Sequence, residues 1–170
     1  MEKIELVKFT DKEENYTLLH KWCSHKDVYE WFEQRILSYP EIVQKYQNKL
    51  KDNNQKLFMI KYNDSYIGLV QIYRYDGIVS EIEGNIYEYD LFIGEEKFLS
   101  KGIGSKVVGI VNKFIYDNYQ AEAIVLRPFK RNLRALKCYL KNNFHIVKEY
   151  QDIDTIGNKE EYVLLINQRG

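Results

Sequence analysis

A long amphipathic segment beside a short apolar one sets the strongest limit on the fold. Residues 102–116 repeat apolar side chains at helical spacing: Ile103, Val107, Ile110, Val111, Phe114 and Ile115. Residues 123–126 follow and are apolar throughout, which is typical of a strand inside a sheet. A strand that is apolar on both faces has to be covered on both faces. The chain is therefore expected to pack helices against a sheet.

The remaining pattern adds more strands than helices. Further strands are predicted over residues 2–9, 56–62, 66–75, 85–93, 144–149 and 161–167. Further helices are predicted over residues 12–23, 26–34, 40–50 and 133–141. Residues 63–65, Asn-Asp-Ser, form a hairpin turn between two of the strands, and residues 76–84 form a loop. This order predicts one α+β domain over residues 1–170, with a mixed, mostly antiparallel central sheet flanked by helices.

Composition excludes several classes of function. Lysine plus arginine and aspartate plus glutamate each total 25, so the zero net charge gives no global attraction to nucleic acid or membrane. The N-terminus has no signal core and no segment is apolar for long enough to span a bilayer, so we expect a cytoplasmic protein. Cys23 and Cys138 are expected to be free thiols, and the three scattered histidines offer no metal site.

The segment between the strand 85–93 and the helix 102–116 carries the clearest binding signal. Its glycines allow the backbone to approach a ligand closely, and unpaired amides at a helix start favour an anion such as a pyrophosphate. A G-x-G pair alone is weak, and the sequence lacks the further residues of nucleotide-triphosphate or dinucleotide loops. The predicted cradle consists of Leu99, Ser100, Lys101, Gly102, Ile103, Gly104 and Ser105, with Lys106 adding charge.

Two motifs in the right order point to a family. Residues 100–105, Ser-Lys-Gly-Ile-Gly-Ser, resemble the coenzyme A pyrophosphate loop of the GNAT N-acetyltransferases. Residues 132–144, from Asn132 to Phe144, resemble their second motif, N-x-x-A-x-x-x-Y-x-x-x-G-F, and the strand 123–126 lies between the two. The resemblance implies the GNAT fold, in which two splayed strands hold acetyl-CoA.

The resemblance extends to the aminoglycoside 6′-N-acetyltransferases over nearly the whole chain. Residues 66–73 resemble their central hairpin strand, residues 89–94 the strand with their catalytic aspartate, and residues 18–31 their substrate-side helices. It implies acetyl transfer to a primary amine of a small molecule, either the 6′-amine of an aminoglycoside or a similar polyamine. Antibiotic resistance would be one role for such an enzyme.

The sequence departs from the family pattern at four places. Leu99 stands where Gln or Arg is usual, and Leu91 where Gln is frequent. Arg127 replaces an aspartate that helps to form the acidic drug-binding surface, which puts a polycationic substrate in question. Asn142-Asn143 replaces a helix-terminating glycine, but asparagine tolerates the left-handed conformation and can end the helix in the same way.

The resemblance also implies roles for single residues. Asp90 would be the base and Tyr139 the acid, although either could instead be a structural side chain. Asn132 is equally a natural N-cap of the helix that follows. The implied cofactor contacts are the backbone of Leu91, Phe92 and Ile93, the loop 99–105, and Asn132, Ala135 and Tyr139 on one helix face.

Acidic and aromatic side chains suggest an acceptor site. We predict substrate contacts from Trp31, Tyr73, Glu83, Glu88 and Asp90. Asp76 and Glu81 would extend an acidic wall, but an ordinary solvated loop explains these acidic residues about as well. Two other functions stay open: acetylation of a protein N-terminus or lysine, and a catalytically silent acetyl-CoA-binding domain. The protein could be a monomer or a homodimer.

Overall fold

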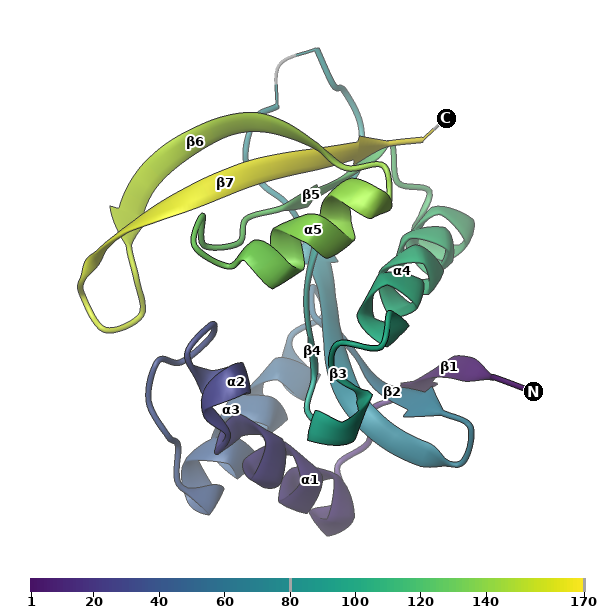
Figure 1. Cartoon of the computed structure of the whole chain (residues 1–170), viewed down its shortest axis with the longest axis vertical. Coiled ribbons are helices and arrows are strands. Elements are labelled where there is room, and N and C mark those ends of the chain that lie inside the picture. The colour runs from purple at the N-terminus through teal and green to yellow at the C-terminus, as the bar shows by residue number, and fades with distance from the viewer. Residues whose placement is uncertain (80, 170) are drawn as a thin grey trace. The chain divides into compact units, whose positions relative to one another are not determined.

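The seven strands form one mixed sheet in the order β1-β2-β3-β4-β5-β7-β6 (Figure 1). The structure is a computed structural model that describes residues 1–79 and 81–169. The pairs β1/β2, β2/β3, β5/β7 and β6/β7 are antiparallel, and β4 pairs with β5 in parallel. The strands are β1 Ile4–Lys8, β2 Lys56–Tyr62, β3 Ser65–Arg74, β4 Ile86–Ile93, β5 Ala123–Leu126, β6 His145–Ile153 and β7 Lys159–Gln168. The predicted α+β class with a mostly antiparallel sheet is confirmed.

The chain divides into two compact units, residues 1–72 with 90–99 and residues 73–89 with 100–170. We call them the N-terminal and C-terminal units. Two of the three boundaries fall within the strands β3 and β4, and the third follows Leu99. That the whole chain is a single domain stays a prediction.

The N-terminal unit packs helices around an aromatic-rich core. Its helices are α1 Glu13–Cys23, α2 Lys26–Tyr29 and α3 Tyr39–Lys51, and a 3₁₀ turn, η1, covers Glu96–Phe98. Helix α3 begins with a capping box, in which Ser38 accepts from the Glu41 amide and the Glu41 carboxylate accepts from the Ser38 amide. The buried core consists of Phe9, Tyr16, Leu19, Trp22, Leu37, Ile42, Tyr46, Leu57, Met59 and Leu69.

The predicted helix over residues 26–34 is wrong beyond Tyr29. Helix α2 ends there, and the chain continues through tighter turns in which the Trp31 and Phe32 amides donate to carbonyls three residues earlier. Gln34 then adopts a left-handed conformation with φ of 60°. The Phe32 ring lies 5.7 Å from the Phe92 ring, so a tertiary contact accompanies the departure from the helix. The turn η1 was also missed, because three residues are too short for a periodic signal.

One glycine in β3 is required by packing. A Cβ atom at Gly68 would lie 2.0 Å from the Phe92 carbonyl oxygen. That distance is far inside van der Waals contact, and the neighbouring atom belongs to backbone that cannot rotate away. Gly68 therefore allows β3 to approach the segment of β4 that carries Phe92.

The C-terminal unit places two helices against its strands. Helix α4 spans Ile103–Tyr119 and α5 spans Leu133–Lys141 (Figure 1). The bounds of β5 and α5 match the sequence prediction, whereas β6 and β7 are longer than predicted. A small core of Val79, Ile86, Ala123, Val125, Leu164 and Ile166 lies among the strands. Among the residues that the structure describes, no helix is both long and apolar enough to cross a membrane.

Candidate active site

The loop before α4 has the backbone geometry of an anion cradle. Ser100 and Gly102 adopt left-handed conformations with φ of 60° and 78°, and Gly102 is the N-cap of α4. No side chain caps this helix, and its first turn carries no acidic residue. The first amides of α4 therefore lack a side-chain acceptor, and the positive end of the helix dipole favours a negative ligand.

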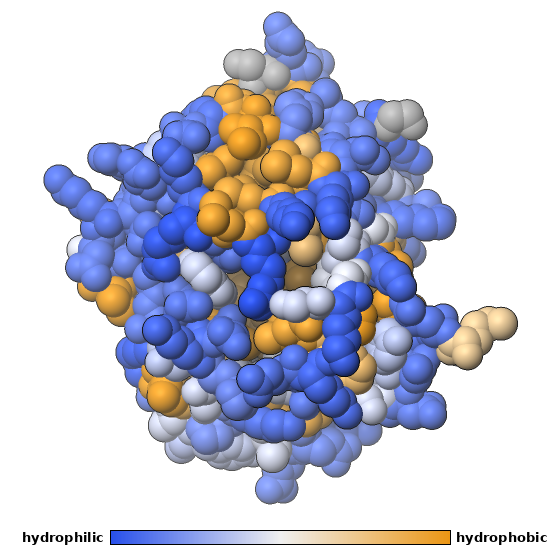
Figure 2. Space-filling view, viewed as in Figure 1, coloured by the Kyte–Doolittle hydropathy of each residue, from blue (hydrophilic) through white to orange (hydrophobic). Residues whose placement is uncertain are grey.

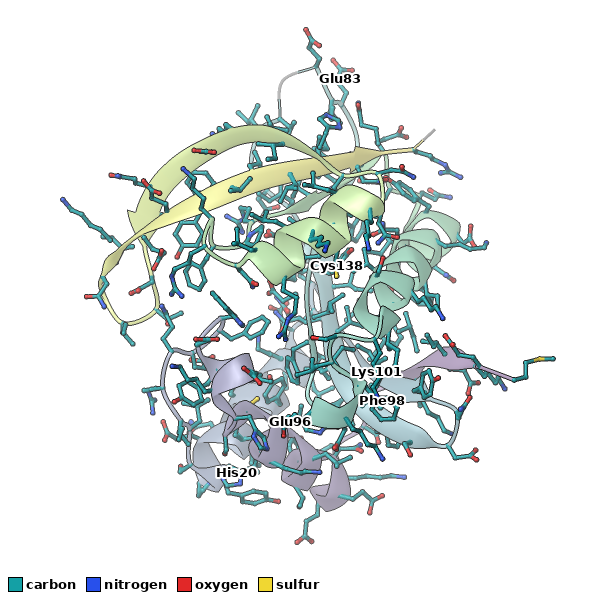
Figure 3. All side chains as sticks on the ribbon, viewed as in Figure 1. His20, Glu83, Glu96, Phe98, Lys101 and Cys138 are labelled. Carbon is teal, nitrogen blue, oxygen red and sulfur yellow. The ribbon has the colours of Figure 1, made fainter. Side chains whose placement is uncertain are left out.

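Packing alone does not explain Gly104. A Cβ at that position would meet only the Cys138 sulfur, at an ordinary distance of 3.8 Å. The fold could accept a larger residue there, so the glycine is better explained by a ligand that needs the backbone to come close. Figure 3 labels Lys101 in this loop and Cys138 on α5. A pyrophosphate group therefore fits the residues that the loop presents.

Asn142, which the sequence predicted only as the end of helix α5, also links this helix to the start of α4. The Asn142 side-chain amide donates to the Ser105 carbonyl and hydroxyl oxygens, each at 3.1 Å, and to the Cys138 carbonyl at 2.8 Å. The next residue, Asn143, has φ of 64°, which confirms the expected left-handed helix end. Asn142 is thus a positioning residue for the cradle.

Helix α5 and its N-cap carry three of the predicted cofactor residues on a partly buried face. The Asn132 side chain accepts a hydrogen bond from the Ala135 amide at 3.3 Å. Asn132 is therefore the N-cap of this helix, which was one of its two predicted roles. Ala135 and Tyr139 are partly buried, and no residue of α5 is fully buried. The Tyr139 ring packs against the Phe144 ring, with 5.8 Å between ring centres, but remains partly exposed. This face could be covered further by a ligand.

Tyr89 is a neighbour of Tyr139 that the sequence analysis did not single out. It is buried, and its hydroxyl donates to the Asn112 side chain at 2.8 Å. Burial, followed by the nearby Tyr139, raises its pKa well above the usual value, so it stays neutral. Its alternation with Asp90 on β4 was visible in the sequence, but its buried hydrogen bond was not.

Asp90 and the segment after it lie in the N-terminal unit. Asp90 is partly exposed on β4. Burial lowers the pKa of Lys49, Lys45 acts in the same direction, and the charge of Asp90 opposes them, which places Asp90 near helix α3. The Phe92 ring packs edge-on against Trp22 at 6.2 Å. Asp90 is thus near a half-buried cation.

The strand end beyond Asp90 is fixed at several points. The Gly94 amide donates to the Ile67 carbonyl at 2.7 Å. The Glu95 carboxylate accepts from the Trp22 indole and from the Lys21 ammonium, both at 2.9 Å. These contacts hold the backbone of Leu91, Phe92 and Ile93 in place, while Leu99 lies just after η1 and is partly buried.

Glu88 does not lie on an open acidic wall. Its carboxylate is 3% exposed and receives two hydrogen bonds from Arg127, at 2.8 Å from Nε and 2.7 Å from Nη2. The Arg127 guanidinium lies 5.2 Å from the Tyr75 ring centre. Tyr73 contributes to the raised pKa of Arg127, after the larger effect of Glu88. The charge of Glu88 is therefore balanced within the protein.

The remaining predicted acceptor residues are dispersed. Glu83 is exposed on the loop before β4, where Figure 3 labels it. Asp76 and Glu81 are exposed on the same loop, which also contains Ser80, outside the described residues. Trp31 belongs to the N-terminal unit and Tyr73 to the C-terminal unit, and both are partly buried. Within the C-terminal unit the acidic residues therefore do not form the predicted continuous wall.

Neither cysteine nor metal chemistry is indicated. Cys23 and Cys138 are free and partly buried, as expected. Burial raises the pKa of Cys23 to about 11, so its thiol stays protonated at neutral pH and is a poor nucleophile. Across residues 1–79 and 81–169, no group of three or more His, Cys, Asp or Glu side chains is placed to hold a metal ion.

Comparison with known protein families identifies the family of this chain. The model of the acetyltransferase (GNAT) domain matches residues 11–152. The chain belongs to the GNAT acetyltransferase family. Acetyltransferase PseH of Campylobacter jejuni (strain 81-176) is 24% identical to this GNAT protein over 158 residues, 92% of this chain and 94% of PseH. The family predicted from the two motifs is confirmed.

Other relatives of this GNAT protein are named for different substrates. Aminoglycoside N(6′)-acetyltransferase type 1 of Klebsiella pneumoniae is 23% identical over 140 residues, 78% of this chain and 70% of that protein. The structure of aminoglycoside acetyltransferase AAC(6′)-Ib with coenzyme A has a TM-score of 0.81 at 21% identity, covering 98% and 95% of the chains. Spermidine N-acetyltransferase from Vibrio cholerae, with CoA and spermine, gives 0.79 at 16% identity, covering 97% and 95%. These structures share the fold.

The ion pair between the buried Glu88 and the solvent-exposed Arg127 yields a stability prediction. Arg127→Met would leave the buried Glu88 carboxylate without its partner, so we expect a loss of about 1–3 kcal/mol in the free energy of unfolding. The double variant with Glu88→Met should recover most of the loss, because no buried charge remains. Urea denaturation measures both.

A matched control in the same unit is Lys113→Met. It removes an exposed pair with Asp117 and should cost less than about 0.5 kcal/mol. An Arg127→Met loss no larger than that of the control would show that the Glu88 charge is solvated after all.

Proposed function

We propose that this GNAT protein transfers an acetyl group from acetyl-CoA directly to the primary amine of a small molecule. The observation that carries the proposal is the uncapped N-terminus of α4 behind Gly102 and Gly104. It provides backbone donors for a pyrophosphate, which coenzyme A contains. The relatives that bind coenzyme A or acetylate amines support the same conclusion.

The cofactor would be held by three segments of the chain. The amides of Ser100 to Ser105 would bind the pyrophosphate, with Lys101 adding charge. The backbone of Leu91 to Ile93 would pair with the pantetheine arm as an added strand. Asn132, Ala135 and Tyr139 would line the arm along α5. When bound, acetyl-CoA supplies an acetyl thioester, which an amine can attack without a covalent enzyme intermediate.

The side chains divide the proton transfers between them. An alkylammonium with a pKa of about 10 cannot attack a carbonyl until it loses a proton. Asp90 would bind the ammonium and accept that proton, either directly or through water. A backbone amide in the segment Leu91 to Ile93 would donate to the carbonyl oxygen and stabilise its developing charge. The Tyr139 hydroxyl would donate a proton to the departing sulfur.

For the acceptor we propose an aminoglycoside with a free 6′-amine, or a similar polyamine. The whole-chain resemblance and the aminoglycoside and spermidine relatives support this class. One observation favours a second candidate, a small amine with fewer positive charges. Arg127 stands where an aspartate contributes to the acidic surface of the aminoglycoside enzymes, and its side chain is 41% exposed.

A thiol-release assay with acetyl-CoA tests the function and separates the acceptors. Kanamycin, its 6′-hydroxyl analogue, spermidine, a neutral amino sugar and a peptide with a free N-terminus are compared at equal concentration. We expect turnover of kanamycin and none of the 6′-hydroxyl analogue. Turnover of the amino sugar alone would favour the second candidate. Efficient turnover of the peptide alone would assign the protein to protein acetylation, and cofactor binding without any turnover would indicate a silent domain.

A further inference from the structure

The outer edge of β6 has the properties of an interface. Strand β6 ends the sheet order and pairs only with β7 among the described residues. Eight of its nine residues are exposed. Natural proteins protect such edges with short strands, proline, charged side chains or bulges. Strand β6 has nine residues and no proline, and its protection consists of a bulge between Ile146 and Lys148 and of charges of both signs, which can pair across a two-fold axis.

Apolar side chains are exposed along the same strand. Ile146, Val147 and Ile153 have exposed fractions of 48%, 45% and 55%. Leu140 on the neighbouring helix α5 is 50% exposed. Figure 2 shows apolar surface gathered over the region where Figure 1 draws α5 and β6. A long unpaired strand with apolar side chains would be expected to bind another chain.

We propose that β6 pairs antiparallel with β6 of a second copy of this chain, about a two-fold axis at Tyr150. Opposed residues in an antiparallel pair point to the same side of the sheet, so a symmetric pairing must be centred on a residue. Centring on Tyr150 places Lys148 opposite Asp152 of the other copy, twice. It also places Glu149 opposite Gln151 and Tyr150 opposite itself, and it brings the bulged residue Val147 near Ile153 of the other copy.

The adjacent registers are less favourable. Centring on Lys148 or on Glu149 would place a charge directly opposite its own copy, which is destabilising in a sheet. Centring on Gln151 would separate Lys148 from Asp152 and oppose the charged Glu149 to Ile153. Only the register at Tyr150 matches both charges and apolar side chains.

The two residues that would form the new ion pairs are available. Lys148 and Asp152 make no ion pair with any other residue in the described part of the chain. The Lys148 ammonium lies 5.7 Å from the Tyr150 ring, and the Asp152 carboxylate accepts a local hydrogen bond from the Ile153 amide at 2.8 Å. Opposite charges placed across neighbouring strands stabilise a sheet.

The central segment has the regular backbone that pairing needs. The irregularity in β6 lies between Ile146 and Lys148, whereas Lys148 to Ile153 pair in register with β7. The Tyr150 ring is stacked on the Tyr162 ring of the same chain, with 5.5 Å between ring centres, so its side chain is held by β7. Glu149 is paired with Lys130 at 2.9 Å, so its charge does not oppose association.

Charge reversal tests this dimer without changing the fold. Sedimentation equilibrium of the full chain should give twice the mass of one 20.4 kDa chain. Lys148→Asp and Asp152→Lys each place like charges in both cross-strand pairs, so each should raise the dimer dissociation constant roughly tenfold to a hundredfold. The double variant exchanges the two charges and should restore the dimer.

The control is Lys8→Asp, the same charge change on β1 at the other end of the sheet order, which should leave the mass unchanged. Circular dichroism and thermal unfolding confirm that each variant is folded. A wild-type protein with the mass of a single chain overturns the proposal. A dimer that both single variants leave intact overturns it as well, and a double variant that stays monomeric overturns the register at Tyr150.

Discussion

Replacing Asp90 by asparagine is expected to lower the turnover rate by roughly 10²–10⁴-fold, the range for loss of a general base. The variant keeps the size and hydrogen-bonding capacity of the side chain but removes its charge and basicity. The deficit in kcat should shrink as pH rises, because solvent then supplies more of the neutral amine. Steady-state kinetics of the wild type and the variant over a series of pH values measures this deficit.

The same experiment separates a base from a binding group. If Asp90 only attracts the cation, the loss appears mainly in KM. Asp64→Asn, in the exposed turn between β2 and β3, is the matched control and should leave both constants unchanged. Binding of acetyl-CoA should survive in Asp90→Asn, since backbone and not this side chain would hold the pantetheine. Unchanged kcat and KM in Asp90→Asn would remove it from the mechanism.

Gly104→Val should abolish stabilisation by the cofactor while leaving the protein folded. For the wild type, acetyl-CoA at 100 times its dissociation constant would add about 2.7 kcal/mol to stability and raise the melting temperature accordingly. The variant should lose this shift, because the added carbons occupy the space where the pyrophosphate would meet the α4 amides. Thermal unfolding with and without acetyl-CoA or coenzyme A measures both quantities.

The melting temperature without cofactor provides the control. A Cβ at position 104 meets only the Cys138 sulfur at 3.8 Å, and valine is a better helix former than glycine. The variant alone should therefore melt at or near the wild-type temperature, and Gly104→Ala should show an intermediate cofactor shift. Full retention of the shift in Gly104→Val would place the pyrophosphate elsewhere.

Local patterns in the sequence predicted much of the fold. The short strand Ala123–Leu126 and helix Leu133–Lys141 have the predicted bounds, because complete burial and helical periodicity are strong signals. The left-handed Asn143 was expected because it stands where the family motif has a helix-terminating glycine and because asparagine tolerates this conformation. Strand β6 was predicted too short, since Gln151 and Asp152 are polar on opposite faces and interrupt the alternation.

The site was harder to predict where it depends on partners distant in the sequence. Nothing in the alternation of residues 85–93 shows that Glu88 is paired with Arg127, thirty-nine residues later. The same holds for Asn142, whose side chain reaches back to Ser105. Glycines and helix starts are visible locally, so the loop and the helix start at Gly102 could be predicted, whereas charge pairing across strands could not. The roles proposed for Asp90 and Tyr139 stay predictions.

At Gly68 the backbone of β3 lies close to the backbone of Phe92, and this contact affects how a mutational screen of the protein should be interpreted. Since even a methyl group there would collide with the Phe92 carbonyl, a saturation screen for activity should tolerate no substitution at position 68. In such a screen Gly68 would score like a residue that touches the substrate. Its intolerance would come from backbone sterics alone, so sensitivity at this position is no guide to chemistry. Substitutions that preserve shape but alter charge are the more informative probes of the reaction.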